Sequence, residues 1–512
     1  MTRKLPKYQA ASWDEPIVLD MGRPGRRAFL APEPEPDVRA DVDGLLPAGV
    51  RRKTAPGLPE LSEFEVQRHY NHLSQMTLGM MGINLFGTCT MKYNPRVNER
   101  VTARPELAEV HPNQPEETLQ GVLEIVHRFD GFLRELSGMD RFVFQPGGGA
   151  DAAYTHACVT RAYHASRGEL EQRTEVITTI QTHPCSAATA AAAGFDVITL
   201  PLGPNGYPTL ESLQAAVSDK TAALMVGNPD DMGIYNPEIK QWIAAVHDAG
   251  GLCFYDHANF NGVMTRIKAR ELGFDACMFM LHKTFAGPKG GGGPAVGAYG
   301  CAEHLVPFLP RPLVVEQDGR YALDYDGPQS VGRVREYWGN VPVVVKAYSW
   351  VRSLGLEGLR QAADLSVIAN NYMETRLLEI PGVTKSHPQI TSHRLEMTRY
   401  SLEQVTEQTG IDVHDIQNRM VDYGVDAPWL AHEPWLIPEP ITPEPGELWS
   451  KEDIDTWIDV LADVVREAHE DPETVKTAPH HQAISQVDAS GVDDPTQWAT
   501  TWRAHRRKQG VA

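Results

Sequence analysis

The chain has 512 residues, of which 42% are hydrophobic and 22% are charged, as in ordinary soluble globular proteins. This length allows two or three domains with a large hydrophobic core. The formal charge of −20 excludes a general binder of nucleic acid or of anionic membranes.

The six cysteines are scattered along the chain and form no C-x-x-C pair, so we expect neither a disulfide framework nor a metal site. The N-terminal residues lack an apolar core of signal-peptide length. No run approaches the roughly 18 apolar residues that a membrane span needs. We therefore expect a cytoplasmic protein without a membrane attachment.

The N-terminal region, residues 1–75, is predicted to be an arm followed by a helix. Residues 1–60 are rich in proline and charge, which indicates an extended arm around a neighbour or around the parent domain. A disordered leader is an equally open interpretation. A helix is predicted from Ser62 to Gln75. A loop with Thr88 and Cys89 follows, whose hydroxyl, thiol and amide groups could bind one anion or simply form a structured turn.

A glycine-rich turn at residues 145–151 lies between a predicted strand and a predicted helix. A long helix, residues 115–136, and a strand, residues 141–144, precede this turn, and a helix from residue 152 to about 166 follows it. Free backbone N–H groups and the positive end of the helix dipole converge there and suit a phosphate. The turn matches neither G-x-x-x-x-G-K-[ST] nor G-x-G-x-x-G, which disfavours a nucleoside triphosphate or a dinucleotide.

Alternating strands and helices follow and predict an α/β domain at residues 76–335. The expected strands are residues 175–179, 196–200, 222–226, 252–255, 276–281 and 295–299, and the expected helices are residues 186–193, 210–216 and 237–249. Such repeated units imply a mostly parallel sheet that is covered on both faces. Ligands bind such sheets beyond the carboxyl ends of the strands.

Polar residues stand at or just after these strand ends. They are the glycine turn, His183, Asn228, Asp256 and Lys283.

Beyond them, residues 336–478 mix helices with short strands and predict a smaller C-terminal α+β domain. Residues 479–512 are expected to form a surface arm.

These parts are the ones that a pyridoxal 5'-phosphate (PLP) enzyme needs. A lysine at the mouth of a buried strand can form the Schiff base, an aspartate keeps the pyridine nitrogen protonated, and the glycine turn holds the phosphate. Each part alone has a simpler alternative: Lys283 as a solvated strand end, Asp256 as a helix N-cap, His183 as a turn residue. Their order along successive strand ends favours the PLP site.

Nearly the whole chain resembles the P-protein of the glycine cleavage system, and specifically its lysine-bearing second subunit in two-chain forms. The matching segments are residues 89–95, 111–118, 161–164, 193–195, 255–259, 281–285 with 290–294, 332–334, 352–355, 422–424 and 427–428. They occur in the family's order from about residue 25 to residue 490.

The resemblance implies a fold-type-I PLP enzyme with a mostly parallel, seven-stranded type of sheet. It implies Lys283 as the Schiff-base lysine, Asp256 at the pyridine nitrogen and His183 stacked on the ring. The residues that it implies near the phosphate are Gly148, Gly149, Ala150 and His282. We expect the substrate to contact Thr88, Cys89, Asn228 and Lys289.

The resemblance further implies that the enzyme releases CO2 from glycine and passes the aminomethyl group to the lipoyl arm of a carrier protein. The expected partners are a sister subunit without the lysine and the lipoyl carrier, in a dimer or a higher oligomer. No nucleic-acid partner is expected.

The chain departs from the family near the cofactor. The family's Q-P-A-A-G-A-H-G-E is Q-P-G-G-G-A-D-A-A at residues 145–153, and its H-G-T-N-P-A-S is H-P-C-S-A-A-T at residues 183–189. Lys289 stands where the family has histidine, and the family's C-x-H-E-F appears as residues 392–397, S-H-R-L-E-M. These changes leave two alternatives open: a stand-alone PLP enzyme acting on a different amino acid, and a structural subunit without PLP.

Overall fold

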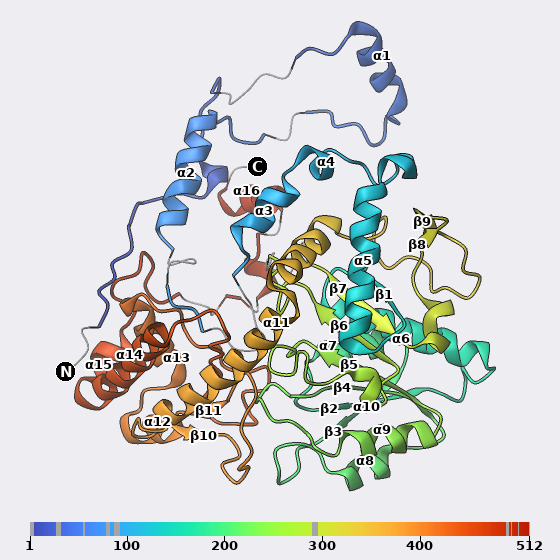
Figure 1. Cartoon of the computed structure of the whole chain (residues 1–512). Coiled ribbons are helices and arrows are strands. Elements are labelled where there is room, and N and C mark those ends of the chain that lie inside the picture. The colour runs from blue at the N-terminus through green and yellow to red at the C-terminus, as the bar shows by residue number, and fades with distance from the viewer. Residues whose placement is uncertain are drawn as a thin grey trace.

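A seven-stranded sheet lies at the centre of the larger part of the molecule, in the order β1-β7-β6-β5-β4-β2-β3 (Figure 1). The computed structural model describes residues 5–26, 32–54, 57–77, 82–85, 93–288, 295–487, 491–492, 494–499 and 501–510. The strands are β1 Arg141–Val143, β2 Glu175–Thr179, β3 Asp196–Leu200, β4 Thr221–Gly227, β5 Leu252–His257, β6 Ala276–Met280 and β7 Gly297–Cys301.

Most strand pairs of this sheet are parallel. The pairs β2–β3, β2–β4, β4–β5 and β5–β6 are parallel, whereas β7 pairs antiparallel with both β6 and β1. The predicted α/β fold with a mostly parallel sheet is therefore confirmed. The carboxyl ends of β2, β4, β5 and β6 meet at one edge, where ligands bind such sheets.

Helices cover both faces of the sheet. Those that contact its strands are α5 Gln120–Ser137, α6 Gly149–Ser166, α7 Cys185–Ala192, α8 Leu210–Ala216, α9 Ile239–Asp248 and α10 Ala269–Leu272. The other short helices of this region are α3 Arg96–Thr102, α4 Pro105–Ala108, η3 Glu116–Thr118 and η5 Glu303–Phe308. Neighbouring residues of β5 show the two layers, since Phe254 packs with α6 and α7 whereas Tyr255 packs with α5 and α9. Side chains alternate between the faces of a strand, so a sheet buried on both faces has a continuous apolar run.

The long helix α11, Val341–Leu377, joins the sheet to a second, smaller core (Figure 1). Its first half packs against the sheet through residues such as Val343 and Val344, and Met373 and Leu377 pack in the smaller core. Gly355 bends the helix with a φ of 63°, a left-handed conformation that glycine adopts without a Cβ clash.

The smaller core contains four further helices and a three-stranded antiparallel sheet. The helices are α12 Glu403–Thr409, α13 Val413–Met420 with η6 Val421–Tyr423, α14 Lys451–Glu470 and α15 Pro472–Lys476, and the strands are β10 Thr384–Lys385, β11 Tyr400–Ser401 and β12 Pro440–Ile441. A separate hairpin, β8 Leu313–Gln317 and β9 Arg320–Asp324, lies beside α5.

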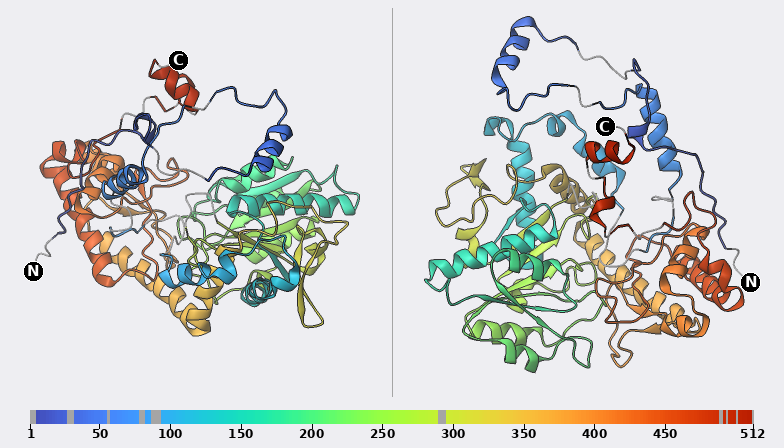
Figure 2. Two further views of the ribbon diagram at one scale, coloured as in Figure 1. Left: turned by 90° about the horizontal axis from the view of Figure 1, so that it is seen from above. Right: turned by 180° about the vertical axis from the view of Figure 1, so that it is seen from behind.

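The outer segments at the two ends of the chain meet in part. They contain η1 Val18–Asp20, α1 Pro36–Leu45, α2 Glu63–Gln75, η7 Pro495–Gln497 and α16 Trp502–Lys508. Figure 2 shows α1 reaching beyond the rest of the molecule and α16 close to η1. An ion pair of 2.9 Å between His505 Nε2 and Asp20 Oδ1 joins the two segments. None of the helices in the described ranges is both long enough and apolar enough to cross a bilayer.

Several predicted element bounds need correction. The helix predicted from residue 115 begins as α5 only at Gln120, after the short η3. The side chains of Glu116 and Gln120 bind backbone groups of β9 there. Helix α6 begins at Gly149 rather than at residue 152, and β7 begins at Gly297 rather than at residue 295. The N-terminal arm also contains α1, which its proline-rich composition did not predict. The proposed domain bounds stay predictions.

Candidate active site

Lys283 lies in a tight turn just after β6, at the strand end where the sequence placed it. Its N–H donates to the Met280 carbonyl at 3.0 Å, and its own carbonyl accepts the N–H of Ala286 at 3.0 Å. The residue is only 4% exposed. Burial removes an amine from water and favours its neutral, nucleophilic form.

Asp256, on the neighbouring strand β5, is as deeply buried as Lys283, at 4% exposure. Its Oδ1 accepts the N–H of Ala258 at 2.8 Å. Burial raises the pKa of the Asp256 carboxyl to about 6, and the opposing attraction comes first from the charge of Lys283. The lysine and the aspartate therefore face one another at the same sheet edge. A carboxylate there suits a protonated ring nitrogen.

His183 follows β2 and belongs to the same group of side chains. Its Nδ1 accepts the N–H of Cys185 at 3.1 Å. Burial lowers the pKa of His183 to about 4, with further lowering by His432 and by Lys283. The imidazole is therefore neutral near pH 7. An uncharged ring of this kind can stack on an aromatic cofactor.

The glycine turn ends at the N-terminus of α6, next to the end of β6. Gly148 is the N-cap residue and supplies no side-chain cap, so the first N–H groups of the helix point outward without an intrahelical acceptor. A Cβ on Gly149 would lie 2.1 Å from Met280 Cε, and one on Gly297 would lie 2.2 Å from the Gly148 carbonyl oxygen. At Gly297 only a glycine permits this close packing, because the neighbouring atom belongs to the backbone, and the packing sets the first turn of α6 against the end of β6.

Further polar groups around the turn fit a phosphate. The guanidinium of Arg335 covers Gly147 and pairs with Asp151 at 3.6 Å, while Asp151 Oδ2 accepts the N–H of Gly147 at 3.0 Å. His282 Nδ1 and Thr284 Oγ1 are buried and have no hydrogen-bond partner within the described ranges. Burial lowers the pKa of His282 to about 4, and the charge of Lys283 adds to this effect. Unpartnered buried atoms beside a helix N-terminus suit a bound anion, so these residues fit PLP.

The predicted substrate contacts are placed only in part. Thr88, Cys89 and Lys289 lie outside the described residues, as do residues 290–294. Asn228 is buried beyond β4, and both ends of its amide bond the backbone of Asn236, at 3.2 and 2.8 Å. Its side chain therefore holds the turn at residues 228–236, and a substrate contact by Asn228 stays a prediction.

Four charged or polar side chains near Lys283 were missed by the sequence reasoning. Asp231 raises the pKa values of Asp256 and His183, and the ring of His432 lies edge-on to His183 at 4.5 Å. Glu433 and Arg399 complete this group through their electrostatic contacts with Asp231. Asp231 follows a strand end and could have been suspected, whereas the other three come from the smaller part of the molecule and had no such signal.

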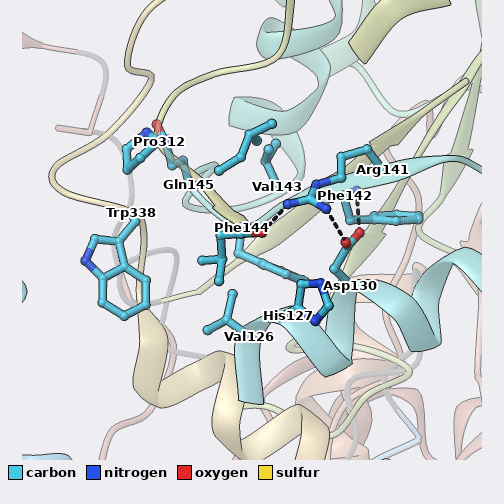
Figure 3. A pocket seen from close by; sticks show the side chains of 12 residues that line it. Val126, His127, Asp130, Arg141, Phe142, Val143, Phe144, Gln145, Pro312 and Trp338 are labelled. Atoms are coloured by element: carbon cyan, nitrogen blue, oxygen red, sulfur yellow. Dashed lines mark hydrogen bonds and ion pairs between the residues drawn. The ribbon is translucent and has the colours of Figure 1, made fainter. Parts of the chain in front are cut away.

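A separate hollow of about 330 Å³, including space open to solvent, lies along β1 (Figure 3). In it Arg141 pairs with Asp130 at 3.2 Å, and Asp130 Oδ1 accepts the N–H of Phe142 at 2.7 Å. Burial raises the pKa of Asp130, while Arg141 opposes this effect. The hollow contains none of the predicted site residues, and its ion pair anchors α5 to β1.

Known proteins match nearly the whole chain. Residues 142–310 match the family "Aminotransferase class-V", and residues 362–486 match "Glycine dehydrogenase, C-terminal domain". A protein of Pyrococcus horikoshii named "Probable glycine dehydrogenase (decarboxylating) subunit 2" is 40% identical over 94% of this chain and 95% of its own length. A protein of the same name from Thermococcus onnurineus is 41% identical over 98% of both chains.

A solved structure has the same fold. The chain aligns with the crystal structure of a glycine decarboxylase (P-protein) of the glycine cleavage system in inhibitor-bound form, with a TM-score of 0.69 and 21% identity, over 85% of this chain and 100% of that one. The fold-type-I architecture inferred from the sequence is confirmed. The chain belongs to the family of glycine dehydrogenase (decarboxylating) subunit 2, a family of PLP-dependent enzymes.

Proposed function

We propose that this protein is the lysine-bearing subunit of a PLP-dependent glycine decarboxylase, which releases CO2 from glycine and passes the aminomethyl group to a lipoyl carrier protein. The observation that carries this proposal is the burial of Lys283 against Asp256 beside the open N-terminus of α6. The names of the relatives do not favour the alternative, a stand-alone enzyme for a different amino acid.

Each site residue has a distinct task in this proposal. PLP, when bound, supplies an electron sink for the electron pair left as the carboxylate of glycine departs. Lys283, buried at the end of β6, would anchor the cofactor through its amine. Asp256 would hold a proton on the ring nitrogen, and the N–H groups of Gly149 and Ala150 would bind the phosphate.

His183 and the buried side chains around it complete the site. Neutral His183 offers an uncharged ring for stacking on the cofactor. The buried walls at Asp256 and Lys283 exclude water and so strengthen every charge interaction with the substrate.

We propose that the protein acts in the cytoplasm together with partner proteins. A lysine-less sister subunit and a lipoyl carrier are the expected partners, in a dimeric or larger cytoplasmic assembly. The name "subunit 2" of the relatives supports a partner subunit.

The test measures exchange of the carboxyl carbon of glycine with ¹⁴C-bicarbonate. The expected result is exchange that depends on PLP, on a purified sister subunit and on an oxidised lipoyl carrier. No exchange with all three present would contradict the proposal. Alanine and serine serve as control substrates, and their carboxyl groups should take up little or no ¹⁴C.

A further inference from the structure

Two buried polar atoms without a hydrogen-bond partner lie close together near Lys283. Asp231 Oδ2 and His432 Nε2 lie 4.0 Å apart, and neither has a hydrogen-bond partner among the residues that the structure describes. Asp231 is only 6% exposed. A carboxylate oxygen that loses water without gaining a donor costs free energy, so an open acceptor in this position indicates a ligand that supplies the donor.

The structure holds both side chains in place while leaving these two atoms open. Asp231 Oδ1 accepts the amide N–H of Asn259 at 3.1 Å, and the Asp231 carbonyl accepts a guanidinium N–H of Arg399 at 3.3 Å. The ring of His432 contacts His183 at 4.5 Å and Trp429 at 5.0 Å, both edge to face. The pair is therefore built from the turn after β4 and from the loop at residues 429–433, which meet only in the folded chain.

This pair belongs to the same space as the cofactor lysine. The charge of Lys283 lowers the pKa values of both His183 and His432, and the Asp231 carboxylate raises the pKa values of Asp256 and His183. Such mutual effects require short separations inside a protein.

We propose that Asp231 and His432 receive the ammonium group of the incoming amino acid and take one proton from it. This inference rests on the proposed function, because it assigns the group that prepares the substrate of that same site. Two acceptors 4.0 Å apart can both lie about 2.8 Å from one nitrogen, and an ammonium group carries three N–H donors.

The proton step is balanced within this pair. One N–H bond of the ammonium group breaks, and the proton moves to Nε2 of His432. The electron pair stays on the substrate nitrogen, which becomes a neutral amine and hence a nucleophile. The imidazolium that forms lies beside the carboxylate of Asp231, which stabilises its charge.

Most groups around His432 keep its imidazole neutral before the substrate binds, and Asp231 favours the proton that it then takes. Burial lowers the pKa of His432, Arg399 and Lys283 lower it further, and Asp231 alone among these charged groups raises it. The imidazole is thus a neutral acceptor near pH 7. Glu433, whose pKa burial and then Asp231 raise to about 7, and neutral His183 are the other titratable groups that face it.

The first experiment uses the full chain without PLP, so that it measures ammonium binding by Asp231 and His432 and does not depend on turnover. The protein is labelled with ¹³C in its histidine rings and studied by NMR. The signal of His432 is assigned as the one that is absent from the spectrum of the His432→Gln variant. Methylammonium should shift this signal in the wild type, and Asp231→Asn should weaken that effect at least tenfold and lower the pKa of His432. Acetate, which lacks the ammonium group, should not reproduce the shift.

Exposed residues provide matched controls. Asp219→Asn and His414→Gln change the same side-chain types at the surface and should leave the methylammonium response unchanged. Absence of a response in the wild type, equal responses in Asp231→Asn and wild type, or an equal effect of acetate would each overturn the proposal.

The second experiment uses the PLP-loaded enzyme with its partners in the glycine exchange assay. Asp231→Asn should raise KM for glycine about tenfold with a smaller change in kcat, and His432→Gln should remove the acid limb from the pH profile of kcat/KM. An unchanged pH profile in His432→Gln would contradict the proton step. A wild type that exchanges no glycine would contradict the proposed function, while the NMR experiment would still decide whether the pair binds ammonium.

Discussion

Lys283 shows at the scale of a single residue how burial determines chemistry. The lysine ends a buried strand, and its charge interacts with Asp256, His183 and His282. Burial removes the water that otherwise stabilises an ammonium group, and Asp256 partly replaces it. The same burial keeps both neighbouring imidazoles neutral near pH 7, so neither adds a positive charge beside the lysine.

Replacing Lys283 by alanine should remove the covalent attachment of PLP and nearly all turnover. No other described residue supplies an amine at this sheet edge, so we expect at least a 1,000-fold loss in glycine exchange, or about 4 kcal/mol in activation free energy. The attachment is measured by borohydride reduction and mass spectrometry of the labelled peptide. Lys240→Ala on the exposed side of α9 is the matched control and should keep both properties. Full activity of Lys283→Ala would contradict the assignment.

At the scale of elements, the close contact of α6 with β6 and β7 positions the helix N-terminus that is proposed to bind the phosphate. The helix begins at Gly149, and its first turn lies against Met280 and Gly297. His156 fixes the middle of the same helix, since its ring stacks on Phe254 at 4.5 Å and its Nδ1 lies 3.1 Å from the Tyr299 hydroxyl. The position of the helix N-terminus thus depends on contacts along its buried side.

Gly297→Ala should weaken PLP binding at least tenfold. The new Cβ would lie 2.2 Å from the Gly148 carbonyl oxygen, so the backbone of the glycine turn must move away from the strand. PLP affinity is measured by titration of the unloaded protein, followed by its absorption. Gly131→Ala on α5, where a Cβ meets no atom within 4 Å, should bind PLP normally. Normal affinity in Gly297→Ala would show that the turn tolerates this movement.

His156→Phe should change how stability depends on pH. Burial lowers the pKa of His156 to about 3, so the unfolded chain takes up the proton first as the pH falls below about 6.5. The wild type therefore loses stability from this group between pH 6.5 and 3, by about 1.4 kcal/mol per pH unit, and the variant does not.

The measurement is urea unfolding of wild type and variant at pH 7.5 and pH 5. We expect the wild type to be more stable at pH 7.5, because His156 bonds Tyr299 and lies near Thr160 Oγ1, and expect this advantage to shrink by roughly 2 kcal/mol at pH 5. A difference that stays constant with pH would show that His156 does not titrate in this way.

At the scale of the whole molecule, the sheet and the smaller core are joined by helix α11 and by buried contacts beyond β5. Gly262 donates its N–H to Glu396 Oε2 at 3.1 Å, and Asn261 donates to Glu447 at 2.9 Å. The outer arms add a separate layer: Ala10 donates its N–H to the His481 carbonyl at 2.8 Å, and Glu15 binds both His69 and His72.

Glu15→Gln should loosen the N-terminal arm. Glu15 Oε2 lies 2.7 Å from His69 Nδ1, and Trp13 stacks on His72 at 4.4 Å, so one carboxylate positions both contacts. We expect cleavage within residues 5–20 to become several-fold faster in limited proteolysis, read by mass spectrometry. Glu33→Gln, which removes only an exposed pair with Arg39, is the control. Equal cleavage rates in Glu15→Gln and wild type would contradict the role of Glu15.

The sequence by itself determined the alternation of strands and helices around the large sheet, the position of Lys283 at a strand end and the cofactor class, because apolar periodicity and strand-end chemistry are local along the chain. Strands β2 and β3 agree with it to the residue. Only the tertiary structure decided that Asp231 meets His432, that Arg335 covers Gly147, and that the Asn228 amide bonds Asn236. These contacts join segments distant in sequence or depend on loop geometry, and no local pattern records which side chains the packing of the two cores brings together.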